Sequence, residues 1–219
     1  MAFLPSRRYY PSTVSEITAH DVAAAERLTF FSDAVVAIAI TLLAIELPVP
    51  SGATPEEFAA SLREGWFEYL AFLISFAVIA SHWGAHHRVF RYVRCADNPV
   101  VWLNLFWLLM VVITPFLTRI ITEGDLSFVK FGMYALAQAM QMTTFGVMIA
   151  VIARRGWFAA DTPRSLTRRG WVESLVGASG FLLSLPAFLV VEVWAFAVWA
   201  LVPMIGSPLL RRAGVVGSG

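Results

Sequence analysis

The residues best suited to chemistry lie where the chain is otherwise apolar. Asp33 stands just inside the first long apolar run, and three histidines follow at His82, His86 and His87. A carboxylate with imidazoles is suited to moving protons, and the i, i+4 spacing of His82 and His86 would place two possible metal ligands on one helix face. However, the HExxH arrangement is absent, and Asp97 is the only carboxylate near these histidines in sequence. No nucleophile is paired with a positioned base, so we predict no enzymatic activity and no catalytic, cofactor or metal site.

The elements that must position these residues are membrane helices. Hydrophobic residues make up 58% of the 219 residues and charged residues 14%, against about 45–50% and 25% in soluble domains. Such a chain has more apolar surface than one soluble core can bury, so we predict an all-α integral membrane protein. The formal charge of +1 does not indicate nucleic-acid binding, and the single cysteine, Cys95, excludes an intrachain disulfide.

Apolar runs of about twenty residues, each long enough to cross a bilayer, predict six transmembrane helices. The predicted spans are Leu28–Leu47, Tyr69–Phe90, Val101–Ile121, Phe128–Ile152, Trp171–Leu185 and Leu189–Leu209. We place the corner between the last two at Pro186, and we expect a short helix to start at Thr54-Pro55. Residues 1–25 then form an N-terminal arm, residues 26–210 the six-helix membrane domain and residues 211–219 a tail.

The basic residues predict the orientation of these spans. With six spans both termini lie on one side, and thirteen of the sixteen lysine and arginine residues fall on that side. The positive-inside rule therefore predicts cytoplasmic termini in a multi-pass protein of the cell membrane. The opposite side collects acidic residues, among them Glu46 at the end of the first span. Such a face would concentrate cations near a pore mouth.

The first span also carries a regular apolar stripe. Ile38, Leu42 and Ile45 fall at i, i+4 and i+7, with Thr41 beside them. This spacing places them on one helix face. Periodicity alone favours an ordinary lipid-facing or bundle-core stripe, because any membrane helix offers one. A threonine in such a helix also commonly bonds back to the preceding turn.

Two blocks of residues resemble a known family. Residues 27–33 contain Arg27, Phe31, Ser32 and Asp33 in the pattern R-x-x-x-F-S-D, followed by A-V-x-A-I-A-I-T-L-L. The second block contains Trp83, His87, Arg88 and Phe90, then Leu103-Asn104-Leu105. Together they resemble the first three helices of the transmembrane protein 175 family of potassium channels.

The resemblance implies a potassium channel formed by a homotetramer, with the first helix of each chain lining the pore. It assigns the main apolar constriction to Ile38 and the rest of the ion pathway to Thr41, Leu42 and Ile45. K⁺ would be the permeant ion, and no cofactor is expected. Glu46 would line the outer mouth, or would simply mark the helix end. The resemblance also implies a scaffold network that joins the first three helices, made of Arg27, Phe31, Ser32, Asp33, His82, Trp83, His87 and Asn104.

Two other classes remain open from the sequence. In a proton-coupled transporter or a proton-permeable channel, Asp33 and the histidines would form a titrating relay. A membrane-embedded structural protein would carry no flux at all. Transporters usually contain internal repeats and interrupted helices, whereas R-x-x-x-F-S-D occurs once and the first span is uninterrupted.

Overall fold

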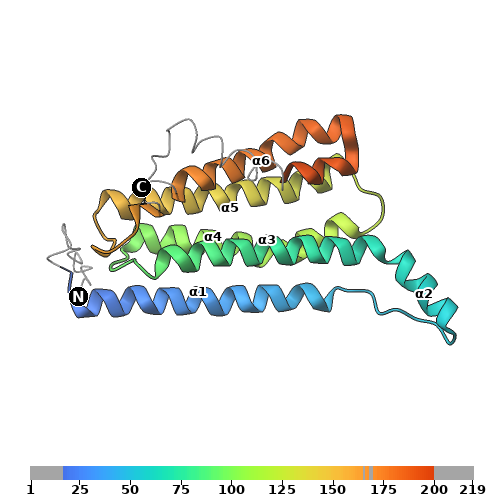
Figure 1. Cartoon of the computed structure of the whole chain (residues 1–219), viewed down its shortest axis with the longest axis horizontal. Coiled ribbons are helices and arrows are strands. Elements are labelled where there is room, and N and C mark those ends of the chain that lie inside the picture. Colours follow the sequence, from blue (N-terminus) through green and yellow to red (C-terminus); the bar gives the residue numbers. More distant parts are fainter. Residues whose placement is uncertain (1–16, 165, 168–169, 200–219) are drawn as a thin grey trace, which may run out of the picture.

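The computed structural model describes residues 17–164, 166–167 and 170–199, and this part of the chain folds into antiparallel helices (Figure 1). Five helices are long and apolar enough to cross a membrane: α1 (Ala19–Ile45), α3 (Trp66–Phe90), α4 (Asn98–Thr122), α5 (Phe128–Arg154) and α6 (Gly170–Val191). The short α2 (Pro55–Glu64) and the 3-10 helix η3 (Glu192–Ala195) complete the set. The prediction of an all-α membrane protein is confirmed. Residues 200–209, about half of the sixth predicted span, lie outside the described residues.

Two helices begin at capping boxes that their sequences encode. Thr18 accepts a hydrogen bond from the backbone of Asp21, whose carboxylate accepts from the Thr18 backbone in return. The same exchange joins Thr54 and Glu57 ahead of α2, which has Pro55 at its first position. Each box satisfies backbone N–H groups that lack a partner within the helix. Consequently α1 starts nine residues before the predicted span at Leu28.

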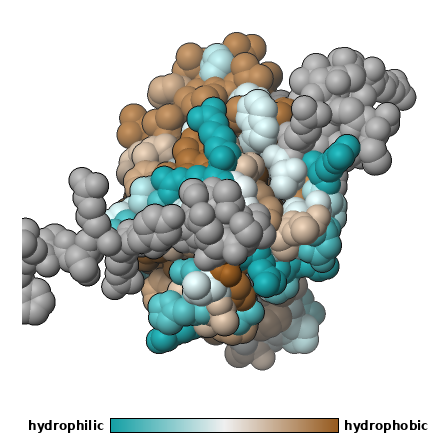
Figure 2. Space-filling model, turned by 90° about the vertical axis from the view of Figure 1, so that its left-hand side faces the viewer, coloured by the Kyte–Doolittle hydropathy of each residue, from teal (hydrophilic) through white to brown (hydrophobic). Residues whose placement is uncertain are grey.

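The loops α3–α4 and α5–α6 meet at the end of the bundle drawn at the left of Figure 1. Gly156, at φ 67°, adopts the left-handed conformation that ends α5. The chain then turns so that Arg94 N–H donates to the Trp157 carbonyl at 2.9 Å, and Asp97 pairs with Arg155. Figure 2 views this end and shows hydrophilic side chains gathered across it below a hydrophobic upper surface.

The predicted corner at Pro186 is wrong. Pro186 lies inside α6, which continues to Val191. A transmembrane helix tolerates proline because neighbouring groups compensate for the missing backbone donor. The chain instead leaves α6 at Glu192, whose φ of 46° lies in the left-handed region, and enters η3. The residues after η3 return to the bundle, where Trp199 Nε1 donates to Ser184 Oγ at 2.8 Å.

Candidate functional site: an unpartnered face of α1 and its polar support

α1 has two unlike faces. Its buried residues, Ala25, Ser32, Val36, Ala39 and Leu43, recur at helical spacing, and α1 packs on α3 and α4. The opposite face is exposed within the single chain, and its large apolar members are Phe30, Phe31, Ile38, Leu42 and Ile45. Ile38 is 60% exposed and Ile45 74% exposed. The predicted stripe is therefore not part of the bundle core of its own chain. An apolar stripe in this position contacts lipid, a second chain or a pore.

Thr41 lies on this exposed face, and its hydroxyl donates to the Ile38 carbonyl at 2.8 Å. This is the local bond expected of a threonine in a membrane helix. Because the hydroxyl hydrogen is used, the outward-facing side of the Thr41 oxygen presents lone pairs. The group can accept from water or contact a cation, and it offers no free donor there.

The buried side of α1 is joined to α3 and α4 by a chain of polar side chains. Asn104 Nδ2 donates to Ser32 Oγ at 2.9 Å, and Asn104 Oδ1 lies 2.9 Å from His86 Nε2. Ser32 in turn donates to the Leu28 carbonyl at 2.8 Å. All three side chains are fully buried. Because Asn104 Oδ1 can only accept, His86 carries its proton on Nε2 in this arrangement.

Asp33 belongs to a second, more exposed contact. The Trp83 indole N–H donates to Asp33 Oδ1 at 2.9 Å, and His87 Nδ1 lies 3.9 Å from Asp33 Oδ2. The Asp33 side chain is 30% exposed. The implied network placed Asp33 together with Arg27, His82 and His87, but among the described residues only His87 of these three lies beside Asp33. Arg27 is exposed and makes no ion pair within the described ranges.

The predicted network is thus divided. The structure brings Ser32 to Asn104, and Asp33 to Trp83 and His87, but His82 faces Gln141 of α5 instead. Phe31 lies on the exposed face of α1. Within the described residues no cluster of three or more His, Cys, Asp or Glu side chains is arranged to hold a metal ion.

His86 is the central residue that sequence reasoning left out of the network. Its ring stacks on Phe90 at 3.9 Å and on Trp107 at 4.6 Å between centroids. Its position repeats the spacing of Ser75, Ile79 and His82 along the buried face of α3. That periodicity would have placed His86 inside the bundle.

Glu46 follows the last residue of α1 and pairs with Arg119 of α4 at 3.0 Å. Arg119 also lies 3.8 Å from Glu123, one turn further along α4. Glu46 is therefore a helix-end residue whose charge is partly offset by Arg119, and the three side chains together keep one negative charge. Its pull on cations is weaker than that of the free carboxylate expected at an outer mouth.

These features define a multi-pass helical membrane protein whose first helix is fixed to the bundle on one side and unpartnered on the other. The family model of the endosomal/lysosomal potassium channel TMEM175 matches residues 27–115, which include most of α1, all of α2 and α3 and most of α4. The chain belongs to the TMEM175 family.

Curated relatives and a solved structure support this assignment. A potassium channel of Streptomyces collinus is 32% identical over 165 residues, 72% of this chain and 79% of the relative. A potassium channel of Chamaesiphon minutus is 35% identical over 148 residues, 65% of this chain and 70% of the relative. The crystal structure of a lysosomal potassium-selective channel TMEM175 homologue from Chamaesiphon minutus superposes with a TM-score of 0.70 at 26% identity. That match covers 85% of this chain and 98% of the solved one.

Proposed function

We propose that this protein is a potassium-selective channel whose apolar constriction is formed by α1. The observation that carries the proposal is the exposed apolar face of α1, which lies on the helix that bears the family motif. The relatives named as potassium channels support the choice of ion. The protein belongs to a channel family, and we assign it no enzymatic activity.

One α1 cannot enclose a water-filled path, so the proposal requires several chains around an axis. We propose a homotetramer in which four exposed α1 faces meet. Four Ile38 side chains would form a ring that excludes water, with Leu42 and Ile45 on the same side one and two turns further along. Such a ring selects ions by the cost of removing their hydration shell, which is lower for K⁺ than for Na⁺. Thr41 oxygens near the ring would offset part of that cost.

We propose that the protein lies in the plasma membrane with both termini in the cytoplasm. The end that joins α3 to α4 and α5 to α6 carries the arginine-rich loops, as the positive-inside rule requires of a cytoplasmic end. The α1 end with Glu46 and Arg119 would then face outward. Membrane lipids and further copies of this chain are the expected partners.

Ion flux in proteoliposomes tests the proposal. Wild-type protein should pass K⁺ faster than Na⁺ with or without a pH gradient. In a proton-coupled transporter, K⁺ flux would require the pH gradient. In a proton-permeable channel, protons would enter and acidify the vesicles without added K⁺. No hydrogen bond joins the Ser32–Asn104–His86 chain to Asp33 among the described residues, so a relay through both has no support. Absence of K⁺ flux in verified tetramers would overturn the proposal.

A further inference from the structure

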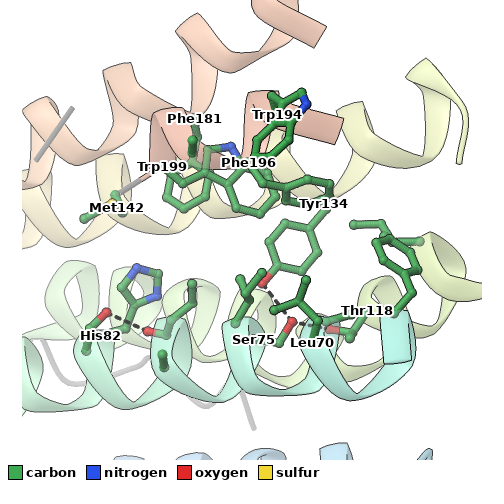
Figure 3. A pocket seen from close by; sticks show the side chains of 18 of the residues that line it. Leu70, Ser75, His82, Thr118, Tyr134, Met142, Phe181, Trp194, Phe196 and Trp199 are labelled. Carbon is green, nitrogen blue, oxygen red and sulfur yellow. Dashed lines mark hydrogen bonds between the residues drawn. The ribbon is translucent and has the colours of Figure 1, made fainter. Parts of the chain in front are cut away.

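A large cavity lies between α3 and the segment that follows α6 (Figure 3). Its volume is about 770 Å³, and α3 lines it from Trp66 to His82. The seventeen residues from Trp66 to His82 are separated by sixteen helical rises, about 24 Å in all. The cavity is therefore elongated along α3, as a single extended hydrocarbon chain is. This space lies on the side of α3 away from α1 and is separate from the proposed ion pathway.

The walls of the cavity are apolar and aromatic, with exposed tryptophans, Trp66 and Trp194, among the lining residues. Polar groups converge on its inner side. Tyr134 and Ser75 share a hydrogen bond at 3.1 Å, and the Thr118 hydroxyl lies 2.7 Å from Ser75 Oγ. These three hydroxyl groups satisfy one another. A cavity of a few hundred cubic ångströms with apolar walls and a few polar groups is the usual form of a small-molecule site.

His82 is a lining residue with a buried ring nitrogen that no hydrogen bond of ordinary geometry satisfies. Its side chain points from α3 into the cavity (Figure 3). The residue is 7% exposed, and its Nδ1 makes no hydrogen bond within the described part of the chain. Gln141 faces it from α5, yet neither amide atom of Gln141 is hydrogen-bonded there. Buried polar atoms of this kind normally have a partner, because leaving them without one is costly.

We propose that this cavity binds a neutral single-chain amphiphile, such as a long-chain alcohol, with its hydroxyl group at His82. The elongated shape accommodates one alkyl chain along α3. The unpaired His82 Nδ1, with Gln141 beside it, supplies hydrogen-bonding capacity for one polar head. A charged head is disfavoured because none of the described residues that line the cavity carries a charge to compensate its burial. A phospholipid tail would offer no polar group to His82 and Gln141, which would then have only each other as partners. The inference does not depend on the proposed ion selectivity.

Photolabelling of the full chain in vesicles tests the inference. The probe is a long-chain primary alcohol that carries a diazirine, and its comparator is the alkane of equal length with the same group. We expect the alcohol to label peptides of α3 and η3 at the cavity and the alkane to label them several-fold less. His82→Leu should lower labelling by the alcohol about fivefold, the usual value of one buried hydrogen bond. It should leave labelling by the alkane unchanged.

A pair of tryptophan substitutions controls for effects on the surface of α3. Ile74→Trp fills the cavity and should abolish labelling by the alcohol, whereas Leu73→Trp changes an adjacent residue outside the lining and should preserve it. Ala77→Trp, also in the lining, replaces Ile74→Trp if that variant does not assemble. Equal labelling by alcohol and alkane would identify a lipid tail and overturn the proposal. No cavity labelling by either probe would mean that other parts of the chain close the space, and would overturn it too.

Discussion

Replacement of Asn104 by alanine tests the polar chain that fixes α1 to the bundle. Asn104 is fully buried and bonds Ser32 on one side and His86 on the other, each at 2.9 Å. Interhelical hydrogen bonds in membrane proteins contribute about 0.6–1.7 kcal/mol each. The loss of two bonds thus costs about 1–3 kcal/mol, and the stranded His86 Nε2 adds about 1 kcal/mol. We expect Asn104→Ala to lower the free energy of unfolding by about 2–4 kcal/mol.

Asp33→Ala should cost less, about 1 kcal/mol. Asp33 loses one indole hydrogen bond at a partly exposed site, and the His87 contact of 3.9 Å joins side chains that are 48% and 30% exposed. An ion pair with that exposure contributes little to stability. The order of the two substitutions is therefore the sharper prediction, since the sequence alone made Asp33 the centre of the network.

Steric trapping in bicelles at one fixed protein concentration monitors unfolding. It measures the loss in free energy of unfolding for Asn104→Ala and for Asp33→Ala on a common scale. Thr29→Ala is the matched control, because the Thr29 hydroxyl bonds only to the Ala25 carbonyl of its own helix at 3.1 Å. It should change the free energy of unfolding by less than about 0.5 kcal/mol. The reasoning is refuted if Asn104→Ala is no worse than this control, or if Asp33→Ala costs more than Asn104→Ala.

Three further predictions follow from the exposed face of α1 and from the loops. Ile38→Asn should raise the resting K⁺ flux about tenfold, equivalent to about 1.4 kcal/mol of barrier, and should reduce the preference for K⁺ over Na⁺. Ala44→Ser, about 120° around the helix from Ile38, should change neither the flux nor the preference. An effect of Ala44→Ser without one of Ile38→Asn would place the pore on another face of α1. Asp97→Ala should lower the free energy of unfolding by about 2–4 kcal/mol, since it leaves Arg155, 36% exposed, without its partner and removes the α4 cap. Asp97→Asn keeps the cap and should cost less, so equal losses would show that capping is irrelevant. Burial raises the pKa of Cys95 to about 11, so only about one thiol in ten thousand is ionised at pH 7. Maleimide should therefore label the native protein slowly, as measured by mass shift. Rapid labelling would contradict the buried position of Cys95.

The sequence was sufficient for the class of protein and for most helix positions. Apolar runs of membrane length fixed α3, α4 and α5 to within three residues of their ends, because every backbone group in lipid must bond within its own segment. Local side-chain rules also fixed the start of α2 at Thr54-Pro55. Local rules were wrong at Pro186, because α6 packs along α5 and continues through the proline to Val191.

Which residues meet across helices was decided by the tertiary structure. The sequence named Ser32, Asp33 and Asn104 together, but only packing assigned Ser32 to a buried chain with His86 and Asp33 to the exposed indole of Trp83. A helix position gives a direction around an axis, and the neighbouring element at that direction depends on how the helices cross. For the same reason the exposure of Ile38 and the burial of Ala39 one residue later could be assigned only once α1 lay against α3 and α4.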